Sequence, residues 1–190
     1  MIVYLHGFNS LGWGNKSKTI AKNYDGEVFA PDYPAHDPDK AITFLQQYLS
    51  ALKQKNLDTN EILLVGSSMG GFYANWLAQT YGYKCVLINP SITPWVTLTQ
   101  YIGENSKFES NEKYTFTKEM LAASKTYAFD PANTRKVSRL VLLDKGDELL
   151  DYRETENLFK HIAKIITYEN GDHRFAHMEE ATPEIIGFMQ

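Results

Sequence analysis

The sequence predicts an α/β protein, a three-layer α/β/α sandwich around a mainly parallel sheet of about six strands. Two observations support this fold class. Short apolar runs alternate along the chain with segments of helical periodicity, and most of these runs are almost continuously apolar, as strands covered on both faces should be. The chain has 190 residues, of which 43% are hydrophobic and 22% charged. This length suits one well-filled core, so we expect a single domain over residues 1–190.

The expected strands are the apolar runs themselves. Each is short, and most consist almost entirely of aliphatic or aromatic side chains, which favours strands buried inside a parallel sheet. In order, they are Ile2–Leu5, Glu27–Ala30, Ile62–Val65, Cys85–Ile88, Leu140–Leu143 and Ile165–Tyr168.

The expected helices lie between and after these strands. Ala41 to Leu52 carries apolar residues at helical spacing, which predicts an amphipathic helix with one face on the sheet. Three more segments with helical character follow the third, fifth and sixth strands, at Phe72–Gln79, Arg153–Ile162 and Pro183–Met189. This alternation of strands and helices is typical of a doubly wound sheet.

Residues 91–133 break the alternation, because no clear strand is evident there and aromatic residues are set among charged ones. A structureless loop of this length is uncommon in a compact domain, so we expect one to three short helices over the carboxyl edge of the sheet. Two interpretations stay open. The segment is either an extra packing layer or a small helical lid that supplies an apolar pocket beside the site.

Composition excludes several classes of function. The formal net charge of -4 and an isoelectric point near 5.7 leave no basic excess for binding a phosphate backbone, so we expect no nucleic-acid partner. Cys85 is the single cysteine, so no intrachain disulfide is possible. The N-terminus shows no leader pattern, and no apolar stretch approaches membrane-spanning length. We therefore expect a cytoplasmic protein without a membrane span; nothing in the sequence indicates an oligomeric state.

The most informative motif is Gly66-Ser67-Ser68-Met69-Gly70, between the third strand and the helix after it. It has the G-x-S-x-G form of a nucleophile elbow, a sharp strand-to-helix turn that lifts a serine Oγ above the sheet toward a base and backbone N–H donors. Glycine is needed two positions either side of the serine, because bulk there would strike the neighbouring strand and helix. Ser68 is therefore the candidate nucleophile.

A base for this serine is expected on a loop at the same edge of the sheet. His173 lies just after the last strand, where the loop can bring its imidazole over the site. His177, near the start of the last helix, is the reserve candidate. His36 lies in a polar, proline-rich loop, which argues against a catalytic role.

The acid that orients the base is expected after the fifth strand, in the chain order Ser, Asp or Glu, His of α/β hydrolases. Several carboxylates crowd the run from Asp144 to Asp151. The turn at Gly146 favours Asp147, at the tip, as the residue that accepts from the Nδ1–H of the histidine. Asp151 and Glu148 stay open as alternatives.

Oxyanion donors are expected from His6-Gly7-Phe8-Asn9, which follows the first strand. Gly7 lets the backbone approach closely, so the N–H of Phe8 can join that of Met69 in an oxyanion hole. His6 is expected to be structural, with its ring hydrogen-bonded to the loop backbone. We expect Gly7 and Asn9 of this loop, and Trp95 of the aromatic segment, to contact substrate.

Together these residues resemble a known family. The runs Tyr4–Ser10, Val65–Ala78, Ile88–Pro90, Gly146–Tyr152 and Gly171–His173 are similar to the YqiA-type small bacterial esterases of the α/β-hydrolase superfamily, over almost the whole chain. The resemblance implies an α/β-hydrolase fold lacking the first two strands of larger relatives. It also implies a triad of Ser68, Asp147 and His173. The chain departs from the family pattern at Lys145 and at Asp172, which places a second acid beside the base.

The function that this pattern predicts is a serine hydrolase that cleaves carboxylic esters or acyl thioesters of small molecules through an acyl-enzyme, without a metal or organic cofactor. Two alternatives stay open: a non-catalytic binding protein on a hydrolase scaffold, and an amidase or peptidase with the same triad. A nucleotide site at Gly12–Ser17 is disfavoured, because a Walker A motif requires Gly and Lys to be adjacent and Asn15 separates them here.

Overall fold

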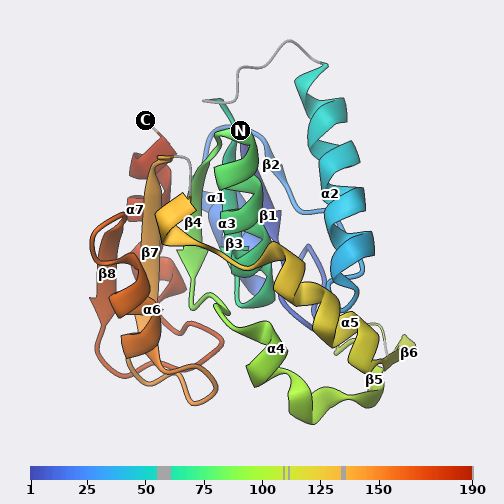
Figure 1. The fold of residues 1–190 in the computed structure, drawn as a ribbon. Coiled ribbons are helices and arrows are strands. Elements are labelled where there is room, and N and C mark those ends of the chain that lie inside the picture. The colour runs from blue at the N-terminus through green and yellow to red at the C-terminus, as the bar shows by residue number, and fades with distance from the viewer. Residues whose placement is uncertain (55–60, 109, 111, 134–135, 190) are drawn as a thin grey trace.

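The computed structural model describes residues 1–54, 61–108, 110, 112–133 and 136–189. Its centre is a sheet in which every pair of neighbouring strands is parallel, in the order β2-β1-β3-β4-β7-β8 (Figure 1). The strands are β1 (Ile2–Leu5), β2 (Val28–Phe29), β3 (Leu63–Ser67), β4 (Lys84–Ile88), β7 (Arg139–Asp144) and β8 (Lys164–Tyr168). The predicted fold class is confirmed.

Each predicted strand is present; β1 has the predicted bounds, and the other strands have shifted ends. β2 is shorter than the predicted run, since only Val28 and Phe29 pair with β1, at Ile2 and Val3. β7 is longer and carries the chain to Asp144, which is fully buried at the carboxyl end of the strand. Because the strands are parallel, their last residues lie at the same edge of the sheet, and the candidate site is at that edge.

Helices cover both faces of the sheet, as Figure 1 shows. On one face α2 (Pro38–Lys53), α3 (Met69–Tyr81) and α6 (Tyr152–Phe159) pack on strand residues such as Leu5 and Leu87. On the other, α1 (Asn15–Asn23) and α7 (Met178–Met189) pack on strand residues such as Tyr4 and Val86. Because successive side chains of a strand point to opposite faces, one continuous apolar run serves both layers.

Two helix predictions were wrong in detail. The sequence pattern did not reveal α1, since its buried face is made by Ser17, Thr19 and Ile20 rather than by an apolar stripe. The last helix begins at Met178, well before the predicted start at Pro183, which lies inside it.

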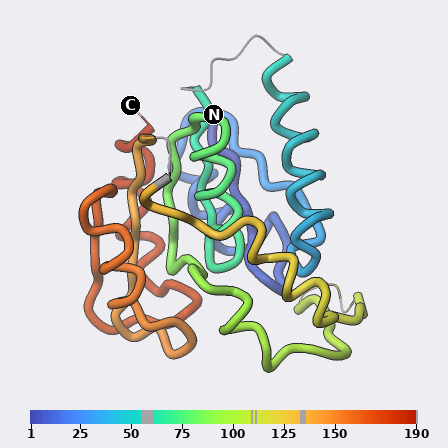
Figure 2. The backbone as a smooth tube through the Cα atoms, in the orientation of Figure 1, coloured from blue at the N-terminus to red at the C-terminus, as the bar shows by residue number. Residues whose placement is uncertain are grey.

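The first part of residues 91–133, light green in Figure 2, lies beyond the carboxyl ends of the strands, and its yellow end runs back past α3 to the start of β7. The prediction of short helices is correct for α4 (Pro94–Thr97) and α5 (Lys118–Ala123). Single 3₁₀ turns occur at Thr99–Tyr101, Ser124–Tyr127 and Pro131–Asn133. The absence of a strand was wrong, because β5 (Gly103–Ser106) and β6 (Lys113–Phe116) form an antiparallel hairpin. β5 consists of Gly-Glu-Asn-Ser and has no apolar run to reveal it.

Close packing at the elbow gives the first testable prediction. A Cβ on Gly70 would lie 2.0 Å from the carbonyl oxygen of Leu5, whereas a Cβ on Gly187 in α7 would meet nothing within 4 Å. Gly70→Ala is therefore expected to lower the free energy of unfolding by about 3 kcal/mol, since backbone must move to admit the methyl group. Gly187→Ala, the matched control, is expected to raise it by roughly 0.5 kcal/mol through helix propensity.

Urea titration of the two variants beside the parent protein measures both effects. Equal stabilities of the Gly70→Ala and Gly187→Ala proteins would contradict the close packing of α3 against β1.

Candidate active site

Ser68 sits at the turn between β3 and α3 with φ of 55° and ψ of -120°, a conformation that is strained for any residue with a side chain. Two glycines make the turn possible. A Cβ on Gly66 would lie 2.2 Å from the carbonyl oxygen of Gly70, and one on Gly70 would strike Leu5 of β1. The glycine spacing predicted for an elbow therefore has its expected steric cause.

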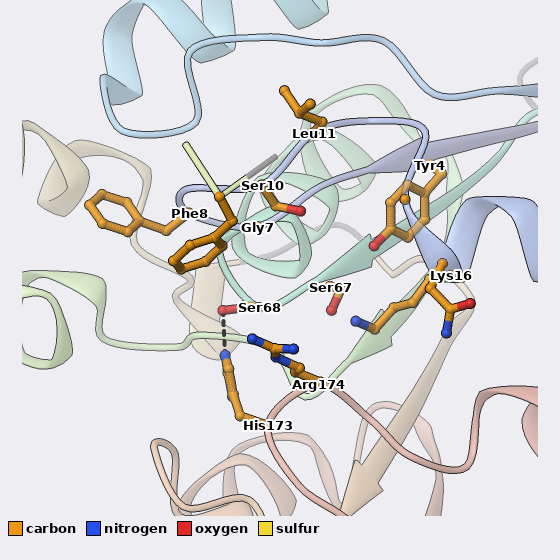
Figure 3. A pocket seen from close by; sticks show the side chains of 13 residues that line it. Tyr4, Gly7, Phe8, Ser10, Leu11, Lys16, Ser67, Ser68, His173 and Arg174 are labelled. Atoms are coloured by element: carbon orange, nitrogen blue, oxygen red, sulfur yellow. Dashed lines mark hydrogen bonds between the residues drawn. The ribbon is translucent and has the colours of Figure 1, made fainter. Parts of the chain in front are cut away.

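The imidazole of His173 joins Ser68 to Asp147. Nε2 lies 3.0 Å from the Oγ of Ser68, and Nδ1 lies 2.8 and 3.0 Å from the carboxylate oxygens of Asp147 (Figure 3 draws the serine contact). An ionised carboxylate only accepts hydrogen bonds, so the ring proton belongs on Nδ1 and Nε2 is left to accept from the serine hydroxyl. The structure thus brings together three residues that the sequence singled out from distant segments.

Asp147 is held in place by its own loop. Its side chain is only 2% exposed, and its Oδ1 accepts the backbone N–H groups of Leu149 and Leu150 at 2.9 Å. This arrangement leaves Oδ2, the oxygen closer to the imidazole, directed at His173.

The two alternative acids have other roles. Glu148 accepts the backbone N–H of His173 at 2.9 Å, and this hydrogen bond lowers the pKa of its carboxyl group. Asp151 caps α6 by accepting the N–H of Arg153 at 3.0 Å. Within the part of the chain that the structure describes, the imidazole ring of His173 is hydrogen-bonded to Asp147 and Ser68 and not to either alternative acid.

His177, the reserve base, belongs to a second buried pair. Its Nδ1 lies 2.7 Å from Oδ1 of Asp144, and its ring stacks on Tyr168. Oδ2 of Asp144 accepts the backbone N–H groups of Ala176 and Asp172 at 2.8 and 3.3 Å. The pair therefore fastens the loop that carries His173 to the end of β7.

Asn89, which follows β4, completes this support. Its Oδ1 accepts the N–H of Asp144 at 2.9 Å, and its Nδ2 donates to the carbonyl oxygen of Asp172 at 3.0 Å. Sequence reasoning did not assign these positions. Asn89 and Asp144 each end or follow an apolar strand, so both could have been recognised as edge residues, but nothing in the sequence indicates their partners.

The loop after β1 covers the serine. A Cβ on Gly7 would lie 3.3 Å from Cβ and 3.8 Å from Oγ of Ser68, so a side chain at this position would crowd the serine. His6 supports this loop: its Nδ1 lies 2.9 Å from the carbonyl oxygen of Gly7, and its Nε2 accepts the N–H of Tyr33 at 3.3 Å. Burial lowers the pKa of His6, which keeps the ring neutral in this structural role.

Phe8 and Asn9 tie this loop to the hairpin of residues 91–133. The ring of Phe8 packs edge-on against Phe116, with centroids 5.1 Å apart. Oδ1 of Asn9 accepts from the hydroxyl of Tyr114, and its carbonyl oxygen accepts the N–H of Phe108 at 2.9 Å. Asn9 has φ of 61°, a left-handed conformation that asparagine tolerates better than most residues.

Two cavities meet at Ser68 and His173. The smaller, about 110 Å³, is lined mainly by apolar side chains, and we call it the apolar pocket. The larger, about 430 Å³, contains the side chains of Lys16 and Arg174, and we call it the cationic pocket (Figure 3). The apolar pocket is lined by Phe8, Asn9, Ser68, Thr97, Leu98, Gln100, Tyr101, Phe108, Leu149 and His173.

The predicted substrate contacts divide between these cavities. Gly7 lines the cationic pocket and Asn9 lines the apolar pocket. Trp95 lines neither; it is partly buried and packs against the core cluster that includes Leu5 and Leu87, while Leu98 and Tyr101 of the same segment reach the apolar pocket. The segment is too short and irregular for its sequence periodicity to show which aromatic or apolar residues face the pocket and which face the core.

Two further findings concern other classes of site. Within residues 1–54, 61–108, 110, 112–133 and 136–189, no cluster of three or more His, Cys, Asp or Glu side chains is arranged to hold a metal ion. Across the same described residues, no helix has the length and apolar character needed to cross a bilayer.

Solved structures place this architecture in one fold class. Est1E from Butyrivibrio proteoclasticus aligns with a TM-score of 0.74 at 18% identity, covering 99% of this chain and 86% of that one. A monoacylglycerol lipase from Paleococcus ferrophilus gives 0.74 at 15% identity, with 99% and 93% covered. Mouse α/β hydrolase domain-containing protein 10 gives 0.73 at 15% identity, with 99% and 88% covered. The protein therefore has the α/β-hydrolase fold.

The particular family follows from the sequence of the whole chain. A family model described as an uncharacterised protein family, UPF0227, matches residues 1–190, and the chain belongs to that family. A UPF0227 protein of Shewanella woodyi is 26% identical over 193 residues, covering 99% of this chain and 98% of its own. The UPF0227 protein YcfP of Escherichia coli is 26% identical over 189 residues, with the same shares covered. The predicted resemblance to this group of α/β-hydrolase proteins is confirmed.

Proposed function

We propose that this protein is a serine hydrolase that cleaves carboxylic esters or acyl thioesters, with Ser68 as nucleophile, His173 as base and Asp147 as the acid that orients it. The observation that carries the proposal is the continuous hydrogen-bonded line from Oγ of Ser68 through both ring nitrogens to Asp147, with spacings of 3.0 and 2.8 Å. Nucleophile and base within hydrogen-bond reach, with the base oriented by a third group, is the arrangement that activates a serine.

The reaction follows from this geometry. Oγ of Ser68 attacks the acyl carbonyl carbon while its proton passes to Nε2 of His173. The oxyanion accepts hydrogen bonds from the N–H groups of Phe8 and Met69; the latter is the first residue of α3, where backbone donors have no partner within the helix. The intermediate expels an alkoxide or thiolate, which takes the proton from His173. Water, deprotonated by the same imidazole, then releases the carboxylic acid and regenerates the serine.

The acyl group is expected in the apolar pocket. Leu98, Tyr101 and Phe108 belong to residues 91–133, so we infer that this segment is the lid insertion of one α/β-hydrolase domain spanning residues 1–190. Two observations support the inference: the first part of the segment lies beyond the carboxyl edge of the sheet, and its hairpin is hydrogen-bonded to the loop of Asn9. An esterase from Pyrococcus furiosus and the monoacylglycerol lipase among the structural neighbours are consistent with ester substrates.

A panel of acyl p-nitrophenyl esters and acyl thioesters of increasing length tests this function. Each methylene that enters the apolar pocket is expected to raise kcat/KM by roughly fourfold, from about 0.8 kcal/mol of burial. Because the pocket is only about 110 Å³, the gain is expected to stop at short chains such as butyryl.

Matched anilides of the same acids extend the panel to amides. Faster hydrolysis of the anilides than of the esters would favour an amidase. No hydrolysis of any substrate by the folded protein would contradict the proposal. A steady gain up to long chains would contradict the assignment of the apolar pocket.

A further inference from the structure

The cationic pocket has no role in the mechanism above, although it opens onto the same serine. Its volume of about 430 Å³ exceeds that of the apolar pocket, and it lies between the loop after β1 and the loop that carries His173. Figure 3 shows the side chain of Lys16 entering it from α1 and that of Arg174 from the loop after β8, with their nitrogen atoms directed toward the space beside Ser67 and Ser68.

Lys16 is held by a rigid element. It lies in the first turn of α1, where backbone N–H groups also favour an anion. The preceding loop is pinned: the N–H of Gly12 donates to Asp32 at 2.6 Å, and Oγ of Ser17 donates to the carbonyl oxygen of Gly12 at 2.7 Å. The segment Gly12–Ser17, which lacks the spacing of a nucleotide-binding loop, therefore serves to place one cation near Ser68.

Charges of both signs surround Lys16. Burial lowers the pKa of Lys16 to about 8, and the nearby Arg174 acts in the same direction, against the attraction of Asp172 and Asp144. Asp144 is already engaged by His177. Among the described residues, neither Lys16 nor Arg174 forms a salt bridge, so no carboxylate in direct contact occupies either cation.

Asp172 itself contributes to this environment. Its Oδ1 is buried without a hydrogen-bond partner in the part of the chain that the structure describes. The carboxylate therefore acts on Lys16 through space rather than by closing the pocket with a direct ion pair, and the pocket keeps its volume.

We propose that the cationic pocket binds an anionic group, a carboxylate or a phosphate, on the leaving-group side of the substrate, while the acyl chain occupies the apolar pocket. This inference rests on the proposed hydrolase function and extends it to a substrate class: short-chain acyl esters or thioesters of acidic alcohols or thiols. Lys16 and Arg174 are its specificity-determining residues.

Three butyryl esters that differ only in the leaving group test the proposal. Their phenols carry, at the position opposite the ester, a carboxylate, a phosphate or a neutral carboxamide of similar shape. The parent protein is expected to prefer the carboxylate or the phosphate ester over the carboxamide by roughly tenfold or more in kcat/KM, mainly through KM, since a charge-assisted contact is at stake. The two anionic arms distinguish carboxylate from phosphate recognition.

The variants Lys16→Gln and Arg174→Gln are expected to reduce this preference, measured as a ratio within each variant. Arg174 is exposed, so its replacement is not expected to disturb the core. The Arg174→Gln variant therefore still tests the proposal if Lys16→Gln fails to fold. Lys18→Gln, on the exposed face of the same helix, is the matched control and is expected to keep the parent preference. Added salt is expected to weaken the preference in the parent protein.

Equal rates on the three esters, or a preference that survives both substitutions, would overturn the proposal. If the protein hydrolyses none of the esters, the hydrolase function fails separately, and titration with inorganic phosphate and with benzoate then tests the pocket itself. Binding that weakens in Lys16→Gln but not in Lys18→Gln would support an anion site, and no binding would refute it.

Discussion

Ser68→Ala is expected to abolish ester hydrolysis, with kcat lower by about 10⁴-fold to 10⁶-fold, because the hydroxyl that would form the acyl-enzyme is gone. Labelling by a fluorophosphonate probe is expected to disappear with it. The fold is expected to persist, since Ser68 is held by backbone contacts that alanine retains, such as the 3.0 Å hydrogen bond from its N–H to the carbonyl oxygen of Ile88.

Ser67→Ala is the matched control for this prediction. Ser67 directly precedes the candidate nucleophile at the end of β3, and the imidazole of His173 is hydrogen-bonded to Ser68 rather than to Ser67. This variant is expected to keep the probe labelling. Circular dichroism of both variants checks the fold. Labelling that persists in Ser68→Ala, or a folded parent protein that the probe never labels, would favour a binding protein on a hydrolase scaffold over the enzyme.

Asp147→Asn is expected to lower kcat by about 10³-fold to 10⁴-fold with little change in the fold. The oxygen of the new amide can still accept the N–H groups of Leu149 and Leu150, as Oδ1 does now. Its NH₂ group then replaces Oδ2 opposite Nδ1 of His173, which lies 2.8 Å away. Two donors cannot face each other, so the imidazole must adopt the tautomer that carries its proton on Nε2 and cannot deprotonate Ser68.

The alternative acids provide controls for this experiment. Glu148→Gln keeps an oxygen that can accept the N–H of His173, and Asp151→Asn keeps a side chain that caps α6. Each is expected to change kcat by less than about tenfold, because neither group contacts the imidazole ring. A large loss of kcat in either variant, together with an active Asp147→Asn protein, would assign the role of the orienting acid to Glu148 or Asp151 instead of Asp147.

Much of the fold was predictable because most of its strands and helices can be recognised from the residues within each element alone. The buried parallel strands are apolar on both faces, so Leu140–Leu143 or Cys85–Ile88 is visible without knowledge of any partner. α1 was missed because Ser17 and Thr19 make its buried face. The β5–β6 hairpin was missed because its stability depends on Phe8 and Asn9, which lie far away in the sequence.

The sequence by itself determined the sheet and the elbow, since glycine spacing and apolar runs are properties of neighbouring residues. The tertiary structure decided which carboxylate meets His173: Asp144, Asp147, Glu148 and Asp151 are close together in the sequence, but each has a different partner. It also decided that Lys16 and Arg174 enter one cavity. The physical reason is that parallel strands align their carboxyl ends, which brings loops from distant segments together. The direction of each side chain there depends on packing between loops and cannot be read from any one of them.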